Sequence, residues 1–338
     1  MNKLKFLSLI VCIGLVCSSN CFAGTDAAAF LKKGVGARAL AMGGAFTSIA
    51  DDTSAVYWNP AGLAKRQQYA FTAMGASGAS DKYPGLKDII PTHQFFALAV
   101  PTSKFTTVLG KTVFGLGYIS STMDNIQYNP EGSTTRKTMS HTDSAYYLSG
   151  GIPIFQGKTS LYAGASLKFI SYDFSEAGLS GSGIDFDIGV IYSVSSLNFG
   201  ALIQKGVVIG DDEAPLTTKF GVSNLFKLGK KFQLMPALDL VQRKDDPLCG
   251  NLGLEFGMRN VLAMDNFGIN GLFLRGGLEG YAIENRHDIT SEMNKNIGYN
   301  FGFGIDFYIS KIYLQLDIAL LSGNIFEQNT KFSLNLYF

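Results

Sequence analysis

The sequence predicts an all-β fold, an antiparallel transmembrane β-barrel of about 14 strands. Three observations predict it. The chain is apolar for an exported protein, with 16% charged residues and a mean hydropathy of +0.15. No run of about 18 apolar residues follows the N-terminal leader, so no membrane-spanning helix is expected there. Residues 68–338 instead alternate between apolar and polar side chains, and a closed barrel is the other structure that satisfies every backbone group in lipid.

Residues 1–23 have the pattern of a secretory signal peptide. Two lysines give a positive start, residues 6–17 form an apolar core, and residues 21–23 read as a small-x-small cleavage site. Three of the four cysteines fall in this leader. Cleavage leaves only Cys249, so the sequence predicts neither an internal disulfide nor a cysteine-based metal site.

The strand pattern has a period of two residues. Ile184 and Phe186, for example, alternate with Asp185. A soluble sandwich also alternates, with its polar face toward water. Here the polar face is poor in Lys and Glu and the apolar face is rich in aromatics, which favours a crowded lumen inside and lipid outside. The expected strands are 68–76, 92–100, 112–121, 143–153, 160–173, 183–193, 196–204, 218–225, 232–241, 249–259, 272–281, 296–309, 311–320 and 329–338.

The connections between these strands alternate in length. Those after odd-numbered strands are mostly long and polar, whereas those after even-numbered strands are mostly tight. Residues 101–111 and 260–271 are exceptions, because both are long for turns. Outer-membrane barrels have long outer loops and short periplasmic turns, so the pattern predicts that both termini lie on the periplasmic side.

The last strand ends on Phe338 after an amphipathic run. This ending resembles the assembly signal of bacterial outer-membrane proteins. It predicts the bacterial cell outer membrane as the location, with outer-membrane lipids and the barrel-assembly machinery as partners.

Several kinds of chemistry find no support. Residues 34–39 match the dinucleotide fingerprint G-x-G-x-x-A, but no βαβ unit surrounds them. His93, His141 and His287 fall in or beside three different outer loops and are expected at the surface. Carboxylates on the polar strand faces are expected to form a structural charge network rather than an acid–base site. We therefore expect no enzyme, no cofactor, no metal and, at a net charge of +1, no nucleic-acid partner.

One segment, residues 34–64, does not alternate; it is rich in Gly and Ala and carries the only Trp. Its ordered motif resembles the FadL-like outer-membrane barrel family, including the PorV/PorQ branch. The matching residues are Gly36-Ala37-Arg38-Ala39, Met42-Gly43-Gly44-Ala45, Asp51-Asp52 and Tyr57-Trp58-Asn59-Pro60-Ala61-Gly62-Leu63.

The resemblance implies that residues 24–67 form a hatch, a small plug inside the lumen, and that residues 68–338 form the barrel. The hatch residues carried over are Arg38, Met42, Asp51, Asp52, Trp58, Asn59, Pro60 and Gly62. These residue types fit a plug, because Gly and Ala allow close backbone approach and an Asn-Pro pair favours a tight turn. Asp51 and Asp52 are expected to face Lys168 or Arg275. The alternative is a periplasmic N-terminal extension.

The resemblance also implies a function, the uptake of hydrophobic small molecules such as long-chain fatty acids through a plugged barrel. Apolar residues in two outer loops are candidates for capturing such a ligand: Leu86, Ile89, Ile90, Val207 and Val208. Pro236 lies inside a strand, where it removes a ladder hydrogen bond, and is a candidate kink or lateral opening. Mutual packing of the loops and an incidental bulge are the alternatives. A PorV-like barrel that binds exported protein cargo in type IX secretion is the alternative function.

Overall fold

The computed structural model describes residues 28–77, 92–104, 110–128, 135, 137–174, 179–206, 208–209, 212–244, 246–282, 297–322 and 330–338. The expected signal peptide lies outside these residues, as do Leu86, Ile89, Ile90, Val207 and His287.

Four short helices precede the strands, and we call residues 28–67, which contain them, the inner segment. They are η1 (Ala29–Lys33), α2 (Ala37–Ala41), α3 (Ala55–Trp58) and η2 (Pro60–Lys65). A further helical turn, η5 (Thr102–Lys104), follows the second strand. The strands are β1 (Ala70–Ser77), β2 (Thr92–Pro101), β3 (Val113–Tyr128), β4 (Lys137–Phe155), β5 (Thr159–Phe174), β6 (Leu179–Val194), β7 (Leu197–Gln204), β8 (Val208–Ile209), β9 (Asp212–Glu213), β10 (Thr217–Asn224), β11 (Phe226–Leu228), β12 (Phe232–Arg243), β13 (Cys249–Ala263), β14 (Phe267–Ala282), β15 (Gly298–Ile309), β16 (Ile312–Leu321) and β17 (Thr330–Tyr337).

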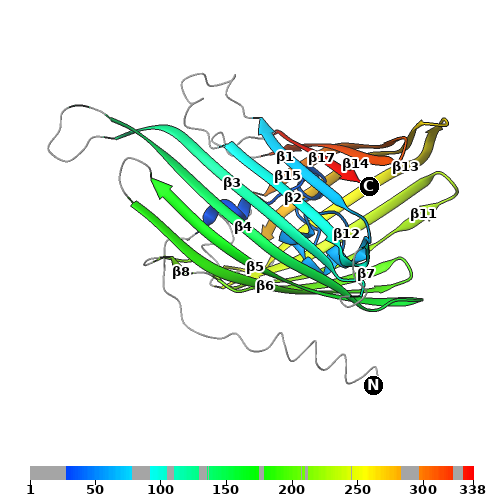
Figure 1. The fold of residues 1–338 in the computed structure, drawn as a ribbon, viewed down its shortest axis with the longest axis horizontal. Coiled ribbons are helices and arrows are strands. Elements are labelled where there is room, and N and C mark those ends of the chain that lie inside the picture. Colours follow the sequence, from blue (N-terminus) through cyan, green and yellow to red (C-terminus); the bar gives the residue numbers. More distant parts are fainter. Residues whose placement is uncertain are drawn as a thin grey trace.

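The strands form a closed antiparallel barrel (Figure 1). The main sheet has fifteen strands in the described residues, and β10 and β11 are two pieces of one strand that both pair with β12, which leaves fourteen around the barrel. β1 pairs with β17 as well as with β2, so the first and last strands close the ring. The predicted fold class is confirmed, including the number of strands.

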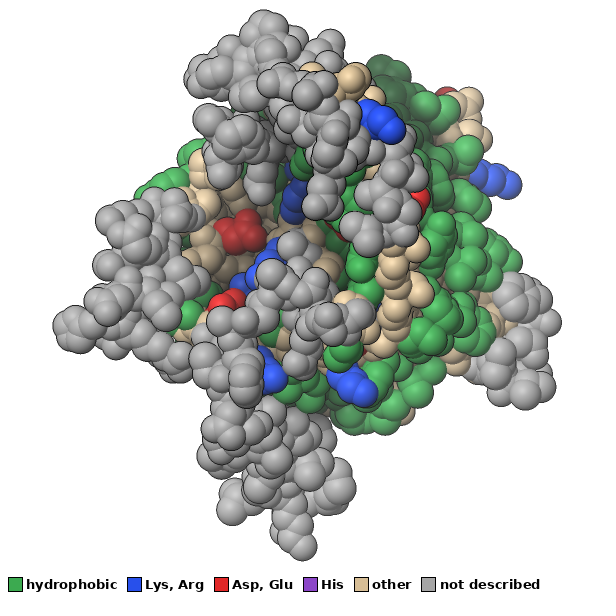
Figure 2. All heavy atoms as spheres, turned by 90° about the vertical axis from the view of Figure 1, so that its left-hand side faces the viewer, with side chains coloured by type: hydrophobic (Ala, Val, Ile, Leu, Met, Phe, Trp, Pro, Cys, Tyr) green, Lys and Arg blue, Asp and Glu red, His purple; other side chains and the backbone are tan. Residues whose placement is uncertain are grey.

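The two faces of the strands follow the predicted alternation. On β6, Ile184 is 64% exposed, whereas its neighbour Asp185 is 5% exposed. Figure 2 shows hydrophobic side chains over the outer surface of the wall and charged side chains within the opening. A barrel with an apolar exterior and a polar interior is the arrangement that suits lipid outside.

Several strand boundaries differ from the prediction. β3 and β4 continue as a paired hairpin as far as Tyr128 and Lys137, beyond the predicted ends. The expected long turn at residues 260–271 is wrong: β13 runs to Ala263 and β14 starts at Phe267. The pairing shifts register between Arg259 and Leu262 and between Ile269 and Gly271. Each shift interrupts the two-residue alternation, so the alternation in the sequence stops before the strands end.

The inner segment lies against the inward faces of the strands, and residues 34–64 are buried apart from the half-buried Asp51. Figure 1 shows its short helices enclosed by the ribbon of strands. Inward-facing glycines make the close contact possible. A Cβ atom at Gly164, Gly200 or Gly277 would lie under 3.0 Å from backbone atoms of the inner segment. The glycine-rich polar face of the strands is therefore the surface that receives this segment.

Candidate functional site

The side chain of Asn59 forms hydrogen bonds within the inner segment and to two strands of the barrel. The Asn59 Oδ1 atom accepts a hydrogen bond from Ala61 N at 3.2 Å, which caps the start of η2. The Nδ2 atom donates to Thr47 O at 2.9 Å, and also to the carbonyl oxygens of Val190 and Ala201 at 3.3 and 3.4 Å. One buried amide thus links two parts of the inner segment to β6 and β7.

Pro60 and Gly62 shape the same turn. Pro60 is the first residue of η2, a position whose N–H would have no partner within the helix. Its carbonyl group packs against the inward-facing Gly151 and Gly164. Gly62 lies against the backbone of Ala50, where any side chain would collide with the carbonyl oxygen. The predicted turn residues therefore lie where the inner segment packs closely against itself and against the strands.

Trp58 is the centre of an aromatic cluster. Its Nε1 atom donates to Val35 O at 2.8 Å, and the side chain is buried. Tyr57 and Phe46 meet its ring edge to face, with centroids 4.9 and 6.2 Å away. The Tyr57 hydroxyl donates to Leu31 O at 2.5 Å. The only Trp of the chain thus joins the start of the inner segment to its middle.

Arg38 connects the inner segment to the barrel wall by charge. Its Nε atom donates to Glu255 Oε2 on β13 at 2.9 Å, and a terminal nitrogen pairs with Asp51 Oδ1 at 2.5 Å. Arg275 on β14 donates to the same Glu255 oxygen at 2.7 Å and to Asp317 on β16 at 2.7 Å. Removing one member would leave buried charges unpaired, which is costly in a low-dielectric interior.

The expected partners of Asp51 and Asp52 are wrong. Asp51 pairs with Arg38, and Asp52 Oδ1 accepts a hydrogen bond from Ser54 N at 2.8 Å. Lys168 is instead held on the wall by two carboxylates of β6, at 2.5 and 2.7 Å. The reason is local, because both carboxylates bond to partners within the inner segment itself and not to side chains of the barrel wall.

The electrostatic environments of the two carboxylates differ. Burial by itself would raise the pKa of Asp51, but the charge of Arg38, with help from Arg66 and Lys65, holds this pKa well below its usual range. Burial, together with the neighbouring Asp51 charge, raises the pKa of Asp52. Asp51 is thus the stronger anchor for a cation.

Met42 directly follows α2 and is fully buried. Gly43 and Gly44 follow it with φ values of 64° and 71°, a conformation that other residues rarely adopt. This sharp reversal packs Met42 against Gly253 on β13. The expected hatch residues therefore all lie within one packed unit.

Sequence reasoning missed the wall residues that hold the backbone of the inner segment. Asp239 Oδ2 on β12 accepts from the N–H groups of Phe46 and Thr47 at 3.1 and 2.9 Å. Asn300 on β15 donates to Leu40 O at 2.9 Å, and Ser333 on β17 accepts from Ala37 N at 2.7 Å. The signal that could have found them is a polar residue on the inward face of a strand.

The expected surface position of His93 is also wrong. His93 is 1% exposed on β2, with its Nε2 atom 2.9 Å from Gly34 O. Its side chain points inward from β2, which begins only one residue earlier, at Thr92. Because His93 lies so close to the preceding loop in the sequence, the prediction placed it at the surface. His141 lies on β4, where it pairs with Asp143 at 3.1 Å.

A cavity of about 80 Å³ lies beside the inner segment toward the end of the barrel that carries the long loops. Tyr57, Tyr147, Lys168, Lys219 and Arg243 contribute to its lining. The Lys219 Nζ atom is 5.7 and 5.3 Å from the ring centroids of Tyr57 and Trp58. In the part of the chain that the structure describes, the Tyr147 hydroxyl has no hydrogen-bond partner. The cavity combines aromatic faces with positive charge.

The remaining predicted residues lie apart from this site. Val208, on the small β8–β9 ribbon, is 63% exposed. Phe338 is 57% exposed, and its N–H donates to Tyr69 O at 3.1 Å beside the seam between β1 and β17.

Pro236 coincides with a two-residue gap in one strand ladder. β12 stays in register with β13 through Pro236, which lies opposite Leu254. On its other side, pairing is interrupted at Met235 and Pro236, between β10 and β11, and resumes in the same register. Leu225, between β10 and β11, donates its N–H to Ser196 O beside β7 at 3.1 Å. The missing N–H of proline accounts for the interruption.

Among the described residues, no group of three or more His, Cys, Asp or Glu side chains is arranged to hold a metal ion. Over the same part of the chain, no helix has the length and apolar character needed to cross a membrane.

Comparison with solved structures finds the same fold. The Pseudomonas putida toluene transporter TodX matches with a TM-score of 0.53 and 12% sequence identity, over 90% of this chain and 97% of TodX. The monoaromatic hydrocarbon channel CymD matches with a TM-score of 0.52 and 11% identity, over 90% of this chain and 96% of CymD. No protein-family model and no curated protein sequence matches the chain. At this level of identity, the likeness shows the barrel fold.

Proposed function

We propose that this chain is an outer-membrane transport protein of the FadL type, which takes up hydrophobic small molecules such as long-chain fatty acids. The observation that carries the proposal is the buried inner segment, packed from Gly34 to Ala64 against the inward faces of the strands. An apolar outer wall and the fold shared with a toluene transporter and a hydrocarbon channel support the same conclusion.

The inner segment acts as the hatch. Fourteen strands enclose a wider lumen than the eight strands whose own side chains fill a barrel. Arg38, Asn59 and Trp58 hold the segment in that lumen by charge, hydrogen bonds and packing. A barrel filled in this way excludes bulk ion flow and leaves room only for ligands that fit the remaining cavities.

The cavity near Lys219 is the candidate for receiving the polar end of a ligand. Lys219 is 7% exposed and faces aromatic rings, so it can pair with a carboxylate away from water. Val208 at the long-loop end and Pro236 at the broken ladder are the candidate capture and lateral-opening positions.

Oleate binding to the purified protein tests this proposal. Mass spectrometry of protein extracted in mild detergent should detect retained fatty acid, and added oleate should bind. Lys219→Met should weaken oleate binding about tenfold or more, because it removes a charge-assisted contact. Lys230→Met, in the exposed turn before β12, is the matched control and should bind like the parent. Absence of both retained lipid and oleate binding would refute uptake of fatty acids.

A second candidate is the PorV-like role, a barrel that holds exported protein cargo in type IX secretion. The β3–β4 hairpin favours it, because the paired strands extend past their predicted ends at the long-loop end of the barrel. The motif of residues 37–39 and 57–60 also resembles the PorV/PorQ branch. Recovery of one defined exported protein with the purified barrel, in the absence of bound lipid, would support this role over uptake.

A further inference from the structure

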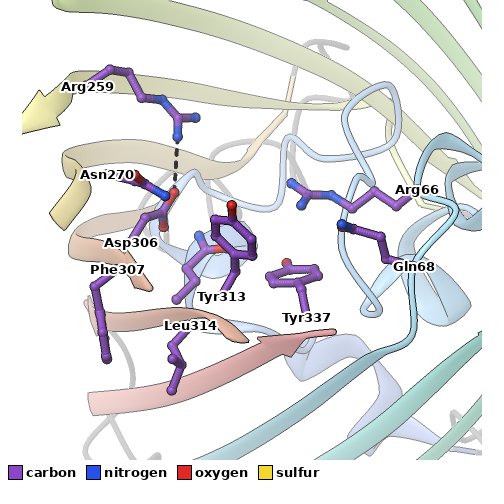
Figure 3. Close-up of a pocket in the computed structure, with 10 residues that line it drawn as sticks. Arg66, Gln68, Arg259, Asn270, Asp306, Phe307, Tyr313, Leu314 and Tyr337 are labelled. Atoms are coloured by element: carbon purple, nitrogen blue, oxygen red, sulfur yellow. Dashed lines mark hydrogen bonds and ion pairs between the residues drawn. The ribbon is translucent and has the colours of Figure 1, made fainter. Parts of the chain in front are cut away.

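A second cavity, of about 300 Å³, lies at the end of the barrel that carries the short turns. It lies where the inner segment leads into β1, beside strands β13 to β17. Figure 3 shows the rings of Tyr313 and Tyr337 between Arg66 on one side and Asp306 with Arg259 on the other. The oleate site proposed above is elsewhere, because this cavity shares no lining residue with the one near Lys219.

Arg66 is a fixed cation at this cavity. Its Nε atom donates to the backbone oxygen of Asp51 at 2.5 Å, and its guanidinium carbon lies 4.6 Å from the centroid of the Tyr337 ring. The Asp51 carboxylate is already paired with Arg38. Among the described residues, no carboxylate forms an ion pair with Arg66, and no acceptor is bonded to its two terminal nitrogens. These nitrogens form the planar pair of donors that suits a carboxylate.

Two buried polar atoms at the same cavity also lack partners among the described residues. Tyr337 is 5% exposed, and within that part of the chain its hydroxyl has no hydrogen-bond partner. The Oδ1 atom of Asp306 is buried and unpartnered, although its Oδ2 atom accepts from Arg259 at 3.2 Å. A buried hydroxyl without a partner is costly to leave unsatisfied, so it points to a ligand that accepts from it.

The charge of the lining selects the kind of acid. Arg66 and Arg259 contribute two positive charges and Asp306 one negative charge, which leaves a net charge of +1. Arg259 and Asp306 neutralise each other as a pair, so Arg66 supplies the excess. A single carboxylate matches this excess, whereas the second negative charge of a diacid would be left without a partner in the cavity.

We propose that this cavity binds the carboxylate of a small organic monoacid. Arg66 is its ion-pair partner, and the Tyr337 hydroxyl donates a hydrogen bond to it. The site is a binding site in its own right and does not require that the barrel transports fatty acids.

Titration calorimetry on the full chain in detergent tests the proposal, with benzoate as the probe because it is soluble and forms no micelles. The parent should bind benzoate measurably more tightly than benzyl alcohol, which has the ring but no charge. Arg66→Gln should weaken benzoate binding about tenfold or more, and Tyr337→Phe should weaken it severalfold. Lys111→Gln is the matched control: this exposed cation pairs with Gln156 near the same end of the barrel and should leave binding unchanged.

Three outcomes would overturn the assignment: no benzoate binding by the parent, equal binding of benzoate and benzyl alcohol, or full binding by folded Arg66→Gln and Tyr337→Phe. Inorganic phosphate bound as tightly as benzoate would refute the preference for a monoacid. If Arg66→Gln does not fold, benzoate binding by Tyr337→Phe is the deciding measurement, because this variant keeps both the aromatic ring and the Arg66 cation beside it. Oleate retention is measured separately, so failure of one proposal does not determine the other.

Discussion

Asn59 shows how much of the inner segment depends on single side chains. Its amide spans Thr47, Ala61 and the carbonyl oxygens of two strands, and it is fully buried. The sequence predicted that Asn59 would bond to its own backbone in a turn, and the bond to Ala61 N has that form. The bonds to β6 and β7 were not predicted, because they depend on strands more than 100 residues away (131 and 142 positions).

Replacing Asn59 with Ala should loosen the inner segment and leave the barrel folded. Buried backbone groups lose their partners, at a cost of about 1–3 kcal/mol. Trp58 is the only Trp, so its fluorescence during urea unfolding reports on the inner segment, while circular dichroism reports on the strands. The Trp58 midpoint should fall and the strand midpoint should change little.

Asn198→Ala provides the control for this experiment. Asn198 lies on β7, where its side chain accepts from Ser193 within the wall at 2.6 Å. It should leave the Trp58 midpoint unchanged. An unchanged Trp58 midpoint in Asn59→Ala would show that the Asn59 bonds do not hold the segment.

At the scale of elements, the inner segment and the wall are matched surfaces. Glycines on inward strand faces meet its backbone, and Glu255, Asp239, Asn300 and Ser333 bind its polar groups. The small residues of the segment and the Gly-rich strand faces were visible in the sequence. Their pairing was not, because periodicity describes each strand separately and says nothing of what lies opposite.

Deleting residues 34–64 should convert a non-conducting barrel into an ion-conducting one. The deletion removes the packed unit from a fourteen-stranded lumen, whose polar face then meets water. Single-channel recording in planar bilayers measures the change against the intact protein. Circular dichroism must show that the shortened chain keeps its strands. A folded deletion variant with the conductance of the parent would refute the hatch.

At the scale of the whole molecule, ring closure depends on the two ends of the strand series. β1 pairs with β17 from Ala70 opposite Tyr337 to Ser77 opposite Thr330. Phe338 follows directly and stacks on Tyr69, with centroids 6.2 Å apart, on the exposed side of this seam. The terminal aromatic therefore lies where closure is completed.

Phe338→Ala should reduce assembly in the outer membrane more than it reduces stability. An exposed side chain contributes little to packing, whereas an assembly signal is needed during insertion. The amount of folded protein in outer-membrane fractions should fall severalfold, while the variant refolded in detergent should unfold at nearly the parent urea concentration. Leu320→Ala, which shortens another exposed apolar side chain on the wall, is the control. Equal amounts of parent and Phe338→Ala in the membrane would refute the signal.

The sequence by itself determined the barrel: its strand number, the two faces of each strand and most strand ends. These follow from a period of two residues, which is a local property of an extended chain. Only the tertiary structure decided the partners inside the lumen. Arg38 and Glu255 are 217 positions apart, and they meet because closure and register set which inward side chains face each other. The same long-range geometry buries His93 against Gly34 and creates the cavity between Arg66 and Tyr337.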